Sequence, residues 1–103
     1  MGVCYSSRVF QITKGIREQM KRDHYYIDME EGNILFDEDI EDFIQEVREA
    51  HGDYYDGLDD DQVLWECGVI DVDYKEDYCY GIGEINFFET KSGDIVCIVN
   101  YAY

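Results

Sequence analysis

The side chains best suited to chemistry are carboxylates, and they gather in residues 37–61. Twelve of these 25 residues are Asp or Glu, and Arg48 is the one Lys or Arg among them. Carboxylates bind hard cations such as Ca²⁺, act as general acids and bases, and pair with Lys and Arg of other proteins. The spacing of the acids decides which of these uses the sequence favours.

Calcium binding by an EF-hand is excluded by the spacing. Such a loop needs Gly at its sixth position and Glu at its twelfth. With Gly57 at the sixth position, the first is Gly52 and the twelfth is Val63; a loop that starts at Asp59 has Leu64 where Gly is required. A less regular divalent-cation site is an alternative, because Ca²⁺ accepts flexible oxygen cages. Its ligands would be Asp53, Asp56, Asp59, Asp60 and Asp61.

Cysteine and histidine are spaced for neither zinc binding nor catalysis. A zinc site would need His24, His51 and cysteines to converge from remote positions, and neither histidine lies in a nucleophile motif. The cysteines contain no Cys-x-x-Cys pair, which indicates free thiols in a reducing cytosol, with two disulfides as the alternative. We therefore predict no catalytic residues, no metal ligands and no cofactor; an enzyme that uses a metal or a thiol is the alternative. The cysteines are Cys4, Cys67, Cys79 and Cys97.

The N-terminal residues match a modification pattern. Residues 1–6 (MGVCYS) fit N-myristoylation, and Cys4 could carry a second acyl chain. An anionic membrane would repel the acidic remainder of the chain, and no apolar run approaches the ~20 residues of a membrane span. We expect a protein that stays off membranes, with acylation as the alternative.

Charge is unevenly distributed along the chain. Residues 1–22 contain five bases and one acid (+4), whereas residues 23–103 contain three bases and 24 acids (−21), which together give −17. Such a protein repels nucleic acid and attracts basic proteins. With 46% hydrophobic and 16% aromatic residues, the chain is too apolar for the acidic disordered class. We predict one folded domain, residues 1–103, with a basic protein partner and no direct nucleic-acid binding.

Three helices are predicted to position these charges. The first covers residues 13–22, with Thr13 as a possible N-cap. The second and clearest covers residues 37–51, with Asp37 or Asp39 as its cap and Gly52 at its end. The third begins at residue 59 or 60 and ends at Gly68. The apolar stripe of the second helix faces a core and consists of Ile40, Phe43, Ile44 and Val47.

Strands are predicted on either side of these helices. Residues 24–36 form two short strands around a turn at 30–33, and residues 69–74, 78–90 and 94–103 are rich in β-branched and aromatic types. Residues 91–93 form a hairpin loop, and residues 3–10 are a possible further strand. The pattern predicts an α+β fold with an antiparallel sheet and two or three helices packed on one of its faces.

The second helix spaces its acids like phosphates. Fifteen residues span about 22 Å, and seven acids then give about one charge per 3 Å, close to the ~3.4 Å between phosphates of one DNA strand. The loop after the helix extends this row, and its tyrosines offer rigid contact area that suits arginine. The predicted partner-binding residues are Asp39, Asp42, Glu46, Glu49, Asp53, Tyr54, Tyr55, Asp56, Asp59, Asp60 and Asp61.

In type, the chain resembles small acidic phage-encoded inhibitors, the anti-CRISPR and antirestriction proteins that occupy DNA-binding channels as DNA mimics. The stretches DEDIEDFIQEVRE and DYYDGLDDD carry this resemblance, and no family motif accompanies them. It implies a cofactor-free inhibitor of a nuclease in the host cytosol, with a CRISPR effector as the first candidate. The alternative function is an acidic immunity or adaptor protein that neutralises a basic partner without imitating DNA.

Overall fold

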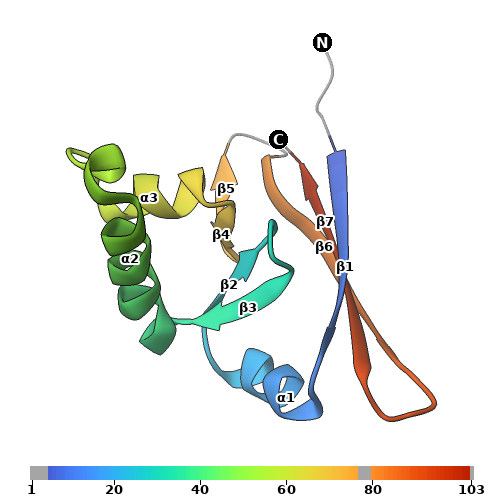
Figure 1. Ribbon diagram of the computed structural model, residues 1–103. Helices are drawn as coiled ribbons and strands as arrows, with labels where there is room; N and C mark the ends of the chain where they lie inside the picture. Colours follow the sequence, from blue (N-terminus) through green and yellow to red (C-terminus); the bar gives the residue numbers. More distant parts are fainter. Residues whose placement is uncertain (1–4, 77–79, 103) are drawn as a thin grey trace.

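Helices and strands are mixed along the chain in the computed structural model, which describes residues 5–76 and 80–102 (Figure 1). The predicted α+β class is confirmed. The helices are α1 (Lys14–Arg22), α2 (Asp37–His51) and α3 (Asp60–Glu66), with a 3-10 turn η1 (Gly52–Tyr55). The strands are β1 (Tyr5–Ile12), β2 (Tyr25–Asp28), β3 (Asn33–Phe36), β4 (Val69–Asp71), β5 (Lys75–Glu76), β6 (Tyr80–Glu89) and β7 (Ile95–Ala102).

The strands form two antiparallel sheets, where the sequence led us to expect one. The larger has the order β1-β7-β6-β5 and the smaller the order β3-β2-β4. Two of the three helices share a face, as predicted: α2 and α3 lie on one side of the smaller sheet, and the larger sheet lies on the other (Figure 1). The smaller sheet is therefore the middle layer.

Side chains of the middle layer alternate between two apolar clusters. Tyr25 and Ile27 of β2 pack toward the larger sheet, whereas Tyr26 packs toward the helices. Leu35 of β3 likewise joins the helix side while its neighbours Ile34 and Phe36 join the other. Because successive strand residues point to opposite faces, this short apolar sheet can hold both outer layers. Its strands are accordingly almost continuously apolar.

The basic helix α1 is anchored to its own chain. Thr13 caps it as predicted, with its hydroxyl oxygen accepting the N–H of Ile16 at 3.1 Å. Lys14 pairs with Glu89 of β6 at 2.9 Å, and the Arg17 guanidinium lies 3.8 Å from the centre of the Phe87 ring. These contacts give part of the N-terminal positive charge a role inside the fold.

A buried carboxylate that sequence reasoning overlooked shapes the β2–β3 turn. Asp28, only 3% exposed, accepts the N–H groups of Glu30 and Glu31 at 3.1 and 3.0 Å. Gly32 follows with a φ of 75°, which glycine adopts without strain. Arg8 of β1 reaches over this turn and donates to the Glu30 carbonyl at 3.0 Å, which ties the larger sheet to the smaller.

The C-terminal strands form the predicted hairpin. The turn between β6 and β7 is closed by Thr90, which donates its N–H to the Asp94 carbonyl at 2.8 Å. A bulge interrupts the register between Ile82 and Glu84. In the described residues, no helix is long and apolar enough to cross a membrane. Residues 1–4 of the acylation pattern and the predicted strand residues 78, 79 and 103 lie outside the described residues.

Two valines on neighbouring strands test the packing between the sheets. Val99 of β7 is fully buried, and Val9 of β1 is 59% exposed on the outer face. We expect Val99→Ala to lower the free energy of unfolding by about 2 kcal/mol, because it removes buried methyl groups and leaves a cavity. Val9→Ala should change it by less than about 0.5 kcal/mol. Urea denaturation measures both, and equal losses would contradict this packing.

Candidate functional site

Helix α2 places its carboxylates on the outside of the molecule. Ile40 and Ile44 are buried against the middle layer, as the spacing predicts. The cap differs from the prediction: Phe36 is the N-cap, Asp37 begins the helix, and Asp39 reaches back to accept the Phe36 N–H at 3.4 Å. Negative charge in this first turn is favoured by the helix dipole.

The acids of this face have few cationic partners. Gln19 and Gln45 donate neutral amide N–H groups to Glu38 and Glu49 at 3.4 and 3.2 Å. In the described part of the chain, His24 and Arg48 are the two cations that pair with acids of residues 37–61. Asp37, the first acid of the helix, pairs with His24, and we name the other exposed acids of α2 the α2 acidic face: Glu38, Asp39, Glu41, Asp42, Glu46 and Glu49.

Arg48 fastens the loop that follows α2. Its guanidinium donates to the carbonyls of Tyr55 at 3.1 Å and Leu58 at 2.8 Å, and it pairs with Asp60 at 3.2 Å. The planar fork of an arginine can hold several acceptors at once, which the point charge of lysine cannot reproduce. The single base within the acidic segment is thus a structural clamp, and sequence reasoning had counted only its charge.

The two loop tyrosines have different positions. Tyr54 is 71% exposed and remains available for contact. The prediction that Tyr55 contacts a partner is wrong, because this side chain is 7% exposed in the core. Its hydroxyl lies 3.8 Å from the Cys67 sulfur, and its ring packs edge-on against His51 with ring centres 5.5 Å apart.

The aspartates before and within α3 are exposed but unequal in role. Asp59 is the N-cap, and its carboxylate accepts the Gln62 backbone N–H at 2.9 Å. The side-chain oxygen of Gln62 in turn accepts the Asp59 N–H at 3.2 Å. Asp60 pairs with Arg48. The alternative of a divalent-cation site at Asp53, Asp56 and Asp59–Asp61 is not supported, since no three of them bring ligand atoms within 4.8 Å of one another.

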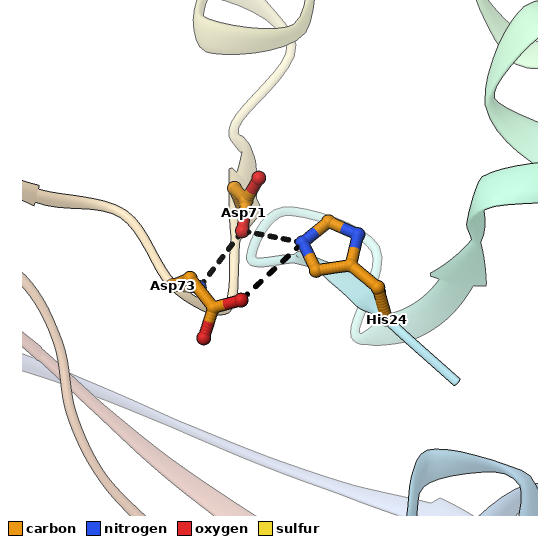
Figure 2. Close-up of side chains that lie close together, drawn as sticks. All are labelled: His24, Asp71 and Asp73. Carbon is orange, nitrogen blue, oxygen red and sulfur yellow. Dashed lines mark hydrogen bonds and ion pairs between the residues drawn. The ribbon is translucent and has the colours of Figure 1, made fainter. Parts of the chain in front are cut away.

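A histidine and three aspartates form a cluster at the start of α2. His24 Nδ1 lies 2.6 Å from Asp37. Its Nε2 lies 2.7 Å from Asp71 and 3.7 Å from Asp73 (Figure 2). The hydrogen bonds with Asp37 and then Asp71 raise the pKa of His24 above 6.5, although partial burial opposes them. The cluster combines three segments that lie far apart in sequence, so no motif could reveal it.

The geometry of this cluster fits a proton better than a metal. Nε2 of His24 and carboxylate oxygens of Asp71 and Asp73 lie within 4.8 Å of one another, so these three residues could hold a divalent ion. Ligands about 2.1 Å from a tetrahedral ion are about 3.4 Å apart. The 2.7 Å between His24 and Asp71 is instead a hydrogen-bond distance, typical of an imidazolium between carboxylates.

The described cysteines are not placed for catalysis. Cys97 is fully buried, and burial raises the pKa of its thiol to about 11, the opposite of what an activated nucleophile needs. Cys67 is half-buried against Tyr55. Both are free thiols. Cys4 and Cys79 lie outside the described residues.

Comparisons with protein-family models, curated proteins and solved structures found no match to this chain. The site therefore has to be interpreted from its own geometry. The geometry brings together a row of exposed carboxylates on α2, an acidic loop held by Arg48, and a histidine that joins the start of α2 to β4.

Removing the Arg48 clamp should loosen the loop. We expect Arg48→Met to lower the free energy of unfolding by about 1–2 kcal/mol, because the Leu58 carbonyl loses its guanidinium donor and the Tyr55 carbonyl keeps only the Leu58 N–H. Amide exchange at Asp56 and Leu58, whose N–H groups bond within the loop, should accelerate. Arg48→Lys is the matched control, and it should restore only part of the loss. Unchanged exchange in Arg48→Met would contradict the clamp.

The His24 cluster should make stability depend on pH. Because the pKa of folded His24 is raised, its stabilisation is complete below about 6.5 and is lost as the pH rises through the folded pKa. Urea denaturation between about pH 5.5 and about pH 9 should show wild type losing stability relative to His24→Gln. His51→Gln, which alters a ring beside Tyr54 and Tyr55, should keep the wild-type decline. Parallel pH profiles of wild type and His24→Gln would contradict this role.

Proposed function

We propose that the protein is a non-enzymatic inhibitor that binds the basic nucleic-acid cleft of a nuclease, with the α2 acidic face in place of DNA phosphates. A CRISPR effector is the first candidate for the nuclease. The observation that carries the proposal is the row of exposed carboxylates on α2 with few cations of the same chain beside it. Carboxylates that have no cation of the same chain beside them are available to an external basic surface.

The dimensions of α2 support a mimic of a phosphate row. Its fifteen residues span about 22 Å, and neighbouring acids three or four positions apart lie about 5–6 Å from each other. Asp42 is the fourth residue after Glu38 and the fourth before Glu46, so these three continue along one side of the helix. Such like-charged neighbours destabilise a helix, which means that the row costs folding energy.

Affinity capture with a matched pair of variants tests the proposal. The tagged protein is incubated with a bacterial lysate that contains nucleic-acid enzymes, and washed with or without excess duplex DNA. We expect a basic nuclease to be retained and then displaced by DNA. The variant Asp42→Asn, Glu46→Gln, Glu49→Gln should retain it at least about tenfold less well, and added salt should weaken binding of the wild type.

The control variant removes the same number of charges elsewhere. Glu30→Gln, Glu31→Gln and Glu84→Gln lie in the β2–β3 turn and on β6, and they should leave capture unchanged. The α2 variant should also be slightly more stable than wild type, by about 0.2–0.5 kcal/mol for each like-charged pair removed. Asp59 and Asp60 are unsuitable targets because they cap α3 and bind Arg48.

The outcomes separate the functional alternatives. A partner that requires the α2 acidic face but is not displaced by DNA would favour the adaptor or immunity protein. Equal capture by wild type and the α2 variant would overturn the role of this face altogether.

A further inference from the structure

A pocket of about 220 Å³ lies between α3 and the segment that follows it. Drug-sized ligands generally occupy pockets of ~300–1,000 Å³, so this volume suits a single side chain. Apolar residues of α3 and β4 complete its lining. Its walls carry the rings of Tyr26, Trp65 and Tyr74 and the carboxylates of Asp61 and Asp71, and we name it the Trp65 pocket.

Two aromatic rings of the pocket form an open angle. The centres of the Trp65 and Tyr74 rings are 5.6 Å apart, and the ring planes are inclined at 51°. Trp65 is nonetheless 49% exposed, which leaves part of its indole surface to solvent. A half-exposed tryptophan beside a second ring at the wall of a pocket is a typical contact surface for a bound group.

The charge around these rings is negative. A second hollow of about 380 Å³ shares Asp61, Trp65 and Tyr74 with the pocket and adds Asp59 and Glu66. As far as the structure describes the chain, no Lys, Arg or His lines either hollow. A ligand that enters the Trp65 pocket therefore has to be compatible with carboxylates.

The pKa of the Tyr26 phenol reflects the same negative charge around the pocket. Its pKa is raised, first by burial and then by the negative charges of Asp71, Asp37 and Asp61. An electron-rich ring in a negative field favours cations over neutral or anionic groups.

The two carboxylates differ in availability. Asp71 already accepts hydrogen bonds from His24 at 2.7 Å and from the Asp73 N–H at 2.8 Å (Figure 2). Asp61 is exposed, and in the described part of the chain it has no ion-pair or hydrogen-bond partner. Asp61 is therefore the carboxylate left to bind a ligand cation.

We propose that the Trp65 pocket binds the guanidinium group of an arginine side chain. The flat cation stacks on the Trp65 indole while its N–H groups donate to Asp61. Arginine fits this combination better than lysine, because a guanidinium is planar, stacks on rings and binds a carboxylate with two parallel hydrogen bonds. The pocket proposal rests on the proposed function in one respect: the arginine belongs to the basic protein that the α2 acidic face attracts.

Tryptophan fluorescence tests the pocket without knowledge of the partner. The chain contains one tryptophan, so selective excitation reports on Trp65 alone. Wild-type protein is titrated at low salt with acetyl-Gly-Arg-Gly-amide, its lysine analogue and its citrulline analogue. We expect a saturable change with the arginine peptide, at least about fivefold weaker binding of the lysine peptide, and weaker binding still of the neutral citrulline peptide.

Variants locate the binding to this pocket. Asp61→Asn should weaken binding of the arginine peptide by about fivefold or more, whereas Glu84→Gln, which removes one charge from β6, should change it by less than about twofold. Trp65→Leu is followed by calorimetry and should abolish the preference for arginine over lysine. Circular dichroism and urea denaturation establish that each variant is folded.

The results distinguish this proposal from the proposed function. Equal binding of the three peptides, or equal effects of Asp61→Asn and Glu84→Gln, would overturn the arginine pocket. If that happens while the α2 variant still loses a partner that DNA displaces, the inhibitor proposal stands alone. If the pocket prefers arginine but capture does not depend on α2, the pocket stands and the inhibitor proposal fails.

Discussion

The alternating apolar side chains of β2, β3 and β4 are the feature on which the rest of the fold depends. Ile27 faces the larger sheet and Tyr26 faces the helices, so one short strand contributes to both clusters. A sheet of three short strands has little stability of its own, and burial of both faces supplies what its few backbone hydrogen bonds cannot. Because both faces of this sheet are covered, α2 is an outer layer, and its side opposite the sheet faces solvent.

That position explains how so acidic a chain can fold. The carboxylates of α2 repel one another, but they do so at the surface, where water and salt reduce the repulsion. The opposing term is the burial of Ile40 and Ile44 beneath them. Arg48 and His24 each bind carboxylates close to α2, and they fasten segments that would otherwise only repel: Arg48 the loop to Leu58, and His24 the strand end at Asp71.

The two proposed contact regions make different demands on a partner. The α2 acidic face offers a row of charges without aromatic rings, which suits an extended basic surface. The Trp65 pocket offers rings beside a carboxylate in a concave site, which suits one particular side chain. In protein interfaces, charge usually provides long-range attraction and a central anchor residue provides local recognition. Here the α2 acidic face would take the first role and the Trp65 pocket the second.

The sequence by itself determined the elements whose signals are local. The spacing of Ile40 and Ile44, the capping by Thr13 and the hairpin at residues 91–93 each depend on residues a few positions apart, and the structure has all three. Only the tertiary structure decided that the strands divide into two sheets, that Tyr55 is buried beside exposed Tyr54, and that His24 lies between Asp37 and Asp71. These outcomes depend on which distant surfaces meet, because alternation along a strand shows that two faces differ but does not show what covers each of them.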